Sequence, residues 1–428
     1  MLDIKFIREN SDKVREAAKN KGVKVEIEKL LELDDRRRQM IQDLEALRAE
    51  QNRKSKSKVG ESEREALKKL KERIKDLETQ LESIEHDYEV RMLTVPNVPT
   101  QDVPIGSDES GNNVIKTVGE PPKFDFEPKD HVELGEKLDL INIEKAGEVV
   151  GTRFAYLKNE AALLQFALAQ LVFQTVTDEK TLKKIIKNAG LNIPTTPFIP
   201  IIPPVFIRPD VYQKMARLEP TEERYYIPTD DLYLIGSAEH TMGPLHMNEM
   251  LSEEELPKRY IGFSSAFRRE AGSYGKDTRG ILRLHQFDKL EMESFTLPEF
   301  GIQEQQLFVA IQEYLLQQLE LPYRVVMICT GDMGKPDARQ VDMEVFMPGQ
   351  DQYRETHTAD YMTDYQARRL NTRVKRSDGE TELVHMNDAT AFAIGRTIIA
   401  ILENYQTKEG TVKIPKVLQK YLGTKEIK

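Results

Sequence analysis

Residues 262–291 read Gly-Phe-Ser-Ser-Ala-Phe-Arg-Arg-Glu-Ala-Gly-Ser-Tyr-Gly-Lys-Asp-Thr-Arg-Gly-Ile-Leu-Arg-Leu-His-Gln-Phe-Asp-Lys-Leu-Glu. Two apolar stretches flank a glycine-rich centre, which predicts two antiparallel strands joined by a long loop. Arg268 and Glu270 lie two residues apart, so both would point to one face of an extended strand, near Phe287 of the returning strand. A guanidinium matches two phosphate oxygens and an aromatic ring stacks on a purine, which predicts a nucleotide site. The alternative is an exposed hairpin in which Arg268 simply pairs with Glu270.

Composition limits the class of protein. A chain of 428 residues with 39% hydrophobic residues has room for two or three domains and a substantial core. The single cysteine, Cys329, excludes an intrachain disulfide and a multi-cysteine zinc site, so we expect a cytoplasmic protein without zinc. The N-terminus carries charge every few residues, unlike a signal peptide. The most apolar tract, 197–207, is short and broken by four prolines, so we expect no membrane association.

The charge of the chain is unevenly distributed. A net charge of -10 ordinarily disfavours nucleic acid as a partner. Residues 48–75, however, hold eleven Lys and Arg against five Glu, a balance of +6 that leaves -16 for the rest of the chain. This basic segment is either a solvated helix face or a surface for a phosphate backbone.

The basic segment lies within a heptad-like pattern. Apolar residues recur three or four positions apart at Leu67, Leu70, Ile74, Leu77, Leu81, Ile84 and Tyr88. An earlier run with the same spacing, interrupted by Arg37, contains Leu30, Leu33, Met40, Leu44 and Leu47. Two helices of roughly thirty residues are predicted to fold back on each other as a rod of about 45 Å. Prolines after Thr94 end the second helix, and the Gly-, Ser-, Asp- and Pro-rich stretch 101–128 is predicted to be a linker.

Two further strings carry candidate chemistry. In Leu-Ile-Gly-Ser-Ala-Glu-His-Thr-Met, which starts at Leu234, Ser237 and Glu239 would face a small polar ligand if the string is a strand, although a plain strand edge is the alternative. In 386–406, small residues open an apolar helix with Arg396 near its beginning, where the helix dipole favours anions. Between them, the alternating stretch 341–348 predicts a strand.

These strings together resemble one family. Phe-Arg-Arg-Glu, a loop and His-Gln-Phe within 262–291 resemble motif 2 of class II aminoacyl-tRNA synthetases, and the loop itself is similar to that of seryl-tRNA synthetases. The proline-rich stretch 198–208 resembles motif 1, the dimer element, and 386–406 resembles motif 3. The resemblance covers nearly the whole chain. It implies an α+β fold, in which an N-terminal antiparallel helical hairpin (a coiled coil) precedes a class II domain on a mostly antiparallel sheet flanked by helices.

The resemblance also implies domains and an activity. Residues 1–100 would bind tRNA through the coiled-coil arm, 101–128 would be the linker and 129–428 the catalytic domain. The expected reaction is that of a serine–tRNA ligase: ATP and L-serine give seryl-adenylate and pyrophosphate, and serine then passes to tRNA(Ser), and also to tRNA(Sec). Mg2+ is the expected metal and a homodimer the expected assembly.

Site residues follow from the same resemblance. Catalytic roles fall on Arg268, Glu355 and Arg396, with Glu355 also the Mg2+ ligand. The serine-binding residues would be Ser237, Ala238, Glu239, Arg268, Glu291 and Thr390. The ATP-binding residues would be Arg268, Arg269, Glu270, Leu284, Phe287, Glu355, Thr356, His357, Thr358 and Arg396. The tRNA-binding residues of the arm would be Arg53, Lys54, Lys56, Lys58, Arg64 and Lys68.

The chain departs from the family pattern near Glu355. His357 stands where a serine is usual, and Ala-Asp-Tyr at 359–361 replaces Cys-Ser-Asn. Two alternatives therefore stay open: a relative that activates an amino acid for a carrier protein, and an inactive structural or regulatory dimer. The basic arm favours tRNA over a carrier protein, and the retained arginines and carboxylates favour activity.

Overall fold

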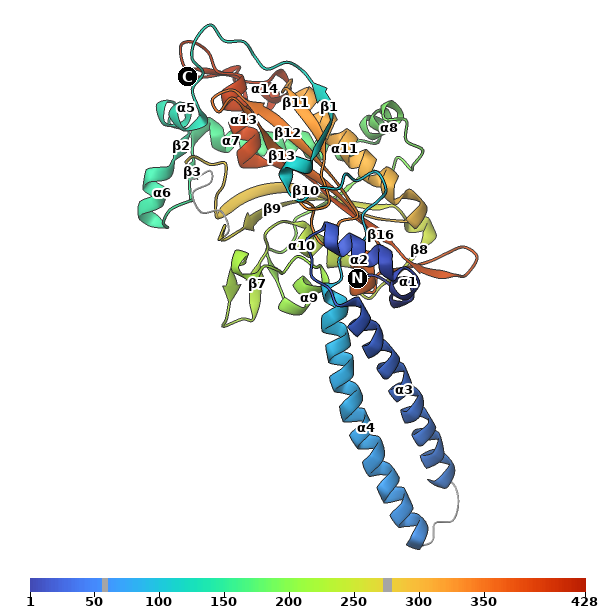
Figure 1. Cartoon of the computed structure of the whole chain (residues 1–428). Helices are drawn as coiled ribbons and strands as arrows, with labels where there is room; N and C mark the ends of the chain where they lie inside the picture. Colours follow the sequence, from blue (N-terminus) through green and yellow to red (C-terminus); the bar gives the residue numbers. More distant parts are fainter. Residues whose placement is uncertain (56–60, 272–278) are drawn as a thin grey trace. The chain divides into compact units, whose positions relative to one another are not determined.

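The computed structural model describes residues 1–55, 61–271 and 279–428, with backbone alone for 61–63. The chain forms two compact units, Met1–Val98 and Pro99–Lys428 (Figure 1). No helix in the described ranges is both long and apolar enough to cross a membrane.

The first unit is entirely helical. Two short helices precede two long ones, and the four are α1 (Ile4–Glu9), α2 (Ser11–Asn20), α3 (Ile27–Ser55) and α4 (Glu61–Thr94). Helices α3 and α4 pack side by side and run in opposite directions (Figure 1). Their contact buries Leu44, Leu70, Ile74 and Leu81, all of which belong to the two predicted apolar runs. The predicted helical hairpin is therefore confirmed.

The interruption of the first apolar run is accommodated by specific pairing. The Arg37 guanidinium carbon lies 4.7 Å from the centre of the Tyr88 ring on the other helix. Arg37 also donates to the buried Asp34, 3.3 Å away, and Asp34 pairs with Arg8 and Arg38, each at 2.9 Å. A paired polar position within an apolar seam helps to fix the register of two helices.

The second unit is built on one large sheet. In spatial order its strands are β1 (Asn113–Val118), β11 (Tyr323–Met327), β12 (Arg339–Met347), β13 (Gln352–Thr363), β16 (His385–Ala393), β10 (Gln286–Thr296), β9 (Lys258–Phe267) and β4 (Ile199–Ile201). Every neighbouring pair is antiparallel except β4 and β9. The mostly antiparallel sheet expected from the sequence is confirmed. Within 101–128, the stretch predicted to be a linker, β1 pairs with β11, so this stretch contributes an edge strand to the sheet.

Helices and smaller sheets surround the large sheet. The helices are α5 (His131–Lys137), α6 (Ile143–Val149), α7 (Asn159–Thr177), α8 (Glu179–Asn188), α9 (Pro209–Lys214), α10 (Glu239–Met242), α11 (Gly301–Gln318), α12 (Tyr365–Leu370), α13 (Ile394–Asn404) and α14 (Lys416–Leu422). The small sheets are β2 (Ile141–Asn142) with β3 (Tyr156–Leu157), β5 (Phe206–Ile207) with β7 (Leu232–Leu234) and β6 (Tyr226–Ile227), β8 (Met250–Ser252) with β14 (Arg373–Lys375) and β15 (Thr381–Leu383), and β17 (Val412–Lys413) with β18 (Glu426–Ile427).

The large sheet has one apolar and one polar face. Helices α7, α11 and α13 pack against its strands (Figure 1). The side chains that form the core with these helices alternate along the strands, as Leu290 and Met292 do on β10 and Ala389 and Ala391 do on β16. The residues between them on the same strands are polar and point the other way, because successive side chains of a strand face opposite sides. The sheet therefore presents a row of polar groups opposite its core.

A fully buried ion pair ties β9 to α11. Arg259 donates to both carboxylate oxygens of Glu304, at 2.8 and 2.5 Å, and neither side chain is exposed. The remaining guanidinium nitrogen donates to the carbonyl groups of Pro194 and Thr196. Every nitrogen of Arg259 therefore has an acceptor.

Removing one charge of this pair should destabilise the fold. Glu304→Gln leaves the buried Arg259 charge uncompensated, and we expect the free energy of unfolding to fall by about 3 kcal/mol. Urea denaturation followed by circular dichroism measures the change. The matched control is Glu148→Gln, since Glu148 pairs with Lys145 at a site where both side chains are more than half exposed, and the expected cost is below about 1 kcal/mol. Equal costs for the two variants would contradict this account of the buried pair.

Candidate active site

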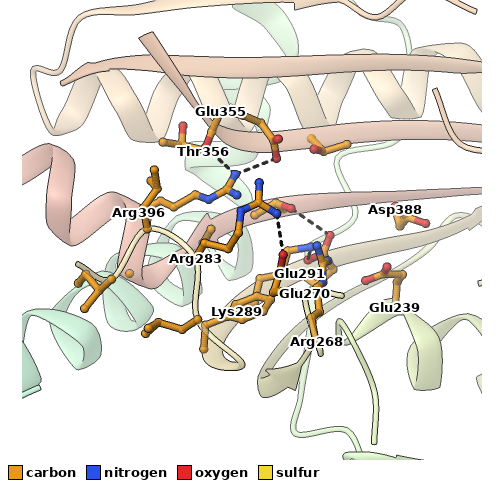
Figure 2. A pocket seen from close by; sticks show the side chains of 18 of the residues that line it. Glu239, Arg268, Glu270, Arg283, Lys289, Glu291, Glu355, Thr356, Asp388 and Arg396 are labelled. Carbon is orange, nitrogen blue, oxygen red and sulfur yellow. Dashed lines mark hydrogen bonds and ion pairs between the residues drawn. The ribbon is translucent and has the colours of Figure 1, made fainter. Parts of the chain in front are cut away.

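A cavity of about 280 Å³ opens on the polar face of the large sheet, and Figure 2 shows the side chains that line it. They come from β10, β13 and β16, from the chain after β9 and before β10, from the starts of α10 and α13 and from the loop after α9. Charged groups of both signs face each other across this cavity (Figure 2). An apolar strip formed by Ile281, Leu282 and Leu284 closes one side.

Two β-bulges determine which side chains enter the cavity. The pairing of β12 with β13 shifts so that Met343 is opposite His357 while Glu344 is opposite Glu355, which leaves Thr356 as the extra residue. The pairing of β10 with β16 shifts in the same way at Ala391. A bulge reverses the alternation of side chains along a strand. Glu355 therefore faces the cavity together with Thr358, although the two are three residues apart.

The motif 2 arginine is placed by backbone contacts. Arg268 donates from Nε to the carbonyl of Gly236 at 3.0 Å, and its guanidinium carbon lies 5.4 Å from the centre of the Phe287 ring. Glu270 accepts from Arg283 Nη1 at 2.6 Å. Arg268, Glu270 and Phe287 all line the cavity.

Arg268 and Glu270 share the cavity as predicted, but the extended strand expected to carry both is wrong. Strand β9 ends at Phe267, and Glu270 has a φ of 53°, so the chain is not extended here. A positive φ turns the backbone, and this turn brings Glu270 to the cavity beside Arg283, whereas the prediction relied on strand alternation.

The predicted serine-binding residues surround Glu291. Ser237 donates to Glu291 Oε2 at 3.3 Å and Thr390 donates to Oε1 at 3.4 Å. Lys289 Nζ lies 2.6 Å from Glu291 Oε2 and donates to Ser237 Oγ at 2.9 Å. Burial raises the pKa of Glu291 to about 8, against the lowering effect of Lys289 and with the help of Glu239. Glu291 is therefore the group that Ser237, Lys289 and Thr390 all contact.

The strand expected at Ser237 and Glu239 is replaced by a turn. Strand β7 ends at Leu234 and Glu239 is the first residue of α10. Glu239 lines the cavity, whereas Ser237 reaches it only through Lys289 and Glu291, and Ala238 lies in the core. The carboxylate of Glu239 stays ionised because His240, Lys289 and Arg217 lower its pKa, which outweighs the effect of burial.

Arg396 and Glu355 form a pair at the opposite end of the cavity. Arg396 is the third residue of α13, and its Nη1 lies 3.1 Å from Glu355 Oε1 and donates to the Glu355 carbonyl at 2.8 Å (Figure 2). The side chain of Glu355 is 51% exposed. Thr356 and Thr358 border the same end.

Two predicted ATP-binding residues do not line the cavity. His357 is buried on the core side of β13, where Nδ1 lies 2.7 Å from Thr356 Oγ1 and the ring contacts Phe392. Burial lowers the pKa of His357 to about 3, so the ring is neutral. Arg269 turns away and stacks over Tyr225 at 5.5 Å. His357, which stands where a serine is usual, therefore packs behind the site and is not part of its lining.

Sequence reasoning missed several lining residues, namely Arg217, Arg283, Lys289, Asp360 and Asp388. Strand alternation could have found Lys289, which precedes Glu291 by two residues, and Asp388, which precedes Thr390 by two. Arg217 lies in an irregular segment after α9, where no periodicity indicates the direction of a side chain.

A buried histidine anchors the chain that returns to β10. His131 Nε2 accepts a hydrogen bond from the Ile281 N–H at 3.2 Å, and Nδ1 donates to Glu403 at 3.0 Å. Gly280 has a φ of 83°, and a Cβ atom there would lie 2.0 Å from His131 Nε2. Gly280 is therefore needed both for its backbone conformation and for the close approach of His131.

Gly280→Ala should destabilise the second unit through both effects. The matched control is Gly379→Ala, because Gly379 has a φ of 91° and open space around its Cβ position. We expect about 1 kcal/mol for Gly379→Ala from backbone strain alone. Gly280→Ala should cost about 2 kcal/mol more, because His131 must move and the Ile281 bond is lost. Thermal unfolding of both variants gives the comparison, and similar losses would show that the His131 contact is unimportant.

Comparisons with known proteins agree along the whole chain. The model of the seryl-tRNA synthetase N-terminal domain matches residues 1–99, and that of the tRNA synthetase class II core domain (G, H, P, S and T) matches 223–405. The serine–tRNA ligase of Dictyoglomus turgidum is 40% identical, with 100% of this chain and 99% of the relative covered. That of Borreliella burgdorferi strain B31 is also 40% identical, with 99% and 98% covered.

Solved structures give the same result. The crystal structure of seryl-tRNA synthetase from Pyrococcus horikoshii complexed with ATP superposes with a TM-score of 0.88 at 36% identity, covering 100% of this chain and 99% of the other. Cytoplasmic serine–tRNA ligase from Naegleria fowleri in complex with AMP superposes with a TM-score of 0.85 at 31% identity, with the same coverage. The chain therefore belongs to the seryl-tRNA synthetase family of class II aminoacyl-tRNA synthetases.

Proposed function

We propose that this chain is a serine–tRNA ligase that forms seryl-adenylate from ATP and L-serine and transfers serine to tRNA(Ser). The observation that carries the proposal is one cavity lined by Arg268 and Phe287, by the pair Arg396 and Glu355, and by the carboxyl groups of Glu239 and Glu291. Full-length relatives named serine–tRNA ligase support it, as does the ATP complex of the Pyrococcus relative.

ATP would lie across the cavity with its adenine against Phe287 and the apolar strip. Arg268 would contact the α-phosphate and Arg396 the γ-phosphate, since guanidinium groups match phosphate oxygens. The described residues contain no group of three or more His, Cys, Asp or Glu that would hold a metal by itself. Mg2+ is commonly bound by one or two carboxylates together with substrate phosphates, and Glu355 beside Thr358 fits that requirement.

Serine would occupy the end lined by Glu239, Glu291 and Thr390. Its hydroxyl would meet Glu291 and Thr390, and a site that satisfies this hydroxyl leaves buried groups unpaired with alanine. Its carboxylate would face Arg268 and attack the α-phosphorus, whereupon the bond to the β-phosphate oxygen breaks and pyrophosphate leaves. Positioning and charge neutralisation supply most of the catalysis, so no protein nucleophile is needed.

The helical hairpin would bind the tRNA. Arg53, Lys54, Arg64 and Lys68 of α3 and α4 are exposed, whereas Lys56 and Lys58 lie outside the described residues. Exposed cations on a long arm suit a phosphate backbone, which the net negative charge of the remaining chain would repel. Charging of tRNA(Sec) by the same enzyme belongs to this proposal.

A homodimer would form at the β4 edge of the sheet. Ile199 on β4 and Ile202 just beyond it are 50% and 73% exposed, and Phe166 on the neighbouring helix α7 is 62% exposed. Contiguous exposed apolar groups mark interaction surfaces, and the sequence resemblance places the dimer element here.

The first test is ATP–pyrophosphate exchange with serine, run beside charging of tRNA(Ser) and tRNA(Sec). We expect exchange with serine and none with alanine, glycine or threonine, and charging of both tRNAs. Exchange without charging would instead support activation for a carrier protein. Absence of exchange would support an inactive structural or regulatory dimer.

Arg268→Ala should lower serine-dependent exchange by roughly 10²–10³-fold or more, because the transferring phosphate loses a preorganised charge. Arg269→Ala is the matched control, since Arg269 stacks on Tyr225 away from the cavity, and we expect nearly full exchange. Circular dichroism verifies that both variants are folded. Undiminished exchange in Arg268→Ala would refute the proposed phosphate contact.

Charge reversal on the arm should affect tRNA alone. In the double variant Arg64→Glu with Lys68→Glu, we expect the KM for tRNA to rise roughly tenfold or more and its salt dependence to weaken, with exchange unchanged. The control reverses Lys183 and Lys184, two exposed lysines of α8, and should leave both activities intact. An unchanged KM for tRNA in the arm variant would argue against tRNA binding there.

A further inference from the structure

Acidic side chains stand next to one another across the sheet beneath the cavity. Glu293 on β10 is directly opposite Asp388 on β16, and Asp388 is directly opposite Asp360 on β13. All three are buried. Like charges in directly opposed positions destabilise a sheet, so this row requires a compensating charge or bound protons.

Arg217 supplies the compensating charge from outside the sheet. Its Nη2 lies 3.1 Å from Asp337 Oδ1 and 3.3 Å from both Asp360 Oδ2 and Asp388 Oδ2. The segment that carries it is fixed in turn, because Arg224 donates to the Arg217 carbonyl from Nε at 3.1 Å and from Nη2 at 2.7 Å. Nearly all of Arg217 is buried, at 17% exposed, and it lines the cavity.

This end of the cavity is rich in hydrogen-bond acceptors. Six carboxyl groups lie here, and burial raises the pKa of the last four of them: Glu239, Asp337, Glu291, Glu293, Asp360 and Asp388. Within the described part of the chain, Glu239 Oε2 and Asp360 Oδ1 have no hydrogen-bond partner, although both residues are more than nine-tenths buried and line the cavity. Unpaired buried acceptors are costly, so this end is suited to a ligand that brings N–H donors and positive charge.

An amino acid brings such a group. Its α-ammonium carries one positive charge and three N–H donors and has no acceptor. Glu239 and Asp388 both border the cavity and lie at the same end of it (Figure 2). Thr390 lies two residues after Asp388 and on the same face of β16. It contacts the Glu291 carboxyl group, which is predicted to hold the serine hydroxyl. An ammonium group between Glu239 and Asp388 would therefore leave the serine hydroxyl near Glu291.

We propose that Asp388 binds the substrate α-ammonium together with Glu239, and that Arg217 is the positioning residue that holds Asp388 in place for it. The inference rests on the proposed function and adds two residues to it. Burial raises the pKa of Asp388 to about 7 while Arg217 opposes that rise, and a bound ammonium group would oppose it further. Asp360 accepts a hydrogen bond from the same Arg217 nitrogen that contacts Asp388.

The test compares two ligands that differ only in the ammonium group. Isothermal titration calorimetry measures the Kd of a non-hydrolysable sulfamoyl analogue of seryl-adenylate and of the same analogue without the α-amino group. The wild-type chain should prefer the amino form. Hydrogen bonds to charged groups correspond to roughly tenfold to hundredfold in affinity, so Asp388→Asn should reduce this preference about tenfold or more. Its affinity for the deamino form should change less than about twofold.

Variants of Arg217 test positioning. Arg217→Gln should reduce the preference as Asp388→Asn does, and Arg217→Lys should restore part of it, because the positive charge is kept while the geometry is altered. The matched control is Asp342→Asn, which makes the same change at a buried aspartate on β12 that does not line the cavity, and its preference should equal the wild-type value.

The outcomes separate this inference from the proposed function. An equal loss of affinity for both analogues in Asp388→Asn would overturn the ammonium contact and assign Asp388 a structural role. An unaltered preference in Arg217→Gln would overturn the positioning role, and if that variant does not fold, the Arg217→Lys preference decides the question. A wild-type chain that binds neither analogue would contradict the proposed function itself.

Discussion

Strand alternation in a single antiparallel sheet is the constraint on which the structure depends. The sheet must bury one face against α7, α11 and α13, and every second side chain is thereby committed to the core. The other side chains necessarily share the opposite face of the sheet. Strand alternation alone therefore brings together polar residues from strands that are distant in sequence. The bulges at Thr356 and Ala391 are two of the places where this alternation is reset, and both lie at or next to residues that line the cavity.

The same constraint brings acidic side chains of neighbouring strands close together, which is unfavourable. Carboxyl groups on β10, β16 and β13 lie directly opposite one another, their pKa values are raised by burial, and one arginine from an irregular segment pairs with two of them. Residues that reduce stability at a site are commonly retained because function needs them. Here the acidic side chains are concentrated where a cationic substrate group is proposed to bind, so binding of that group would stabilise the protein.

Most of the fold followed from pattern, and part of the site did. The spacing of Leu70, Ile74 and Leu81 predicted the helical hairpin, because seam positions recur with the helical period. The placement of Arg268 and Glu270 relied on a strand that ends one residue too early, since a positive φ cannot be read from a glutamate. Arg217 was beyond prediction, because its direction is set by tertiary contacts with Arg224 and three aspartates.

The pairing of Arg396 with Glu355 has a consequence for the affinities of nucleotide and cation. Under the proposed function, a triphosphate that takes Arg396 as its partner releases a carboxylate in the same cavity, and a divalent cation is the natural recipient of that carboxylate. Arg396 then pairs with the triphosphate and Glu355 with the cation, so both side chains keep a partner of opposite charge. Nucleotide that binds without the cation would separate Glu355 from Arg396 and give Glu355 no new partner. Nucleotide and cation should therefore bind with positive thermodynamic coupling, each strengthening the affinity of the other.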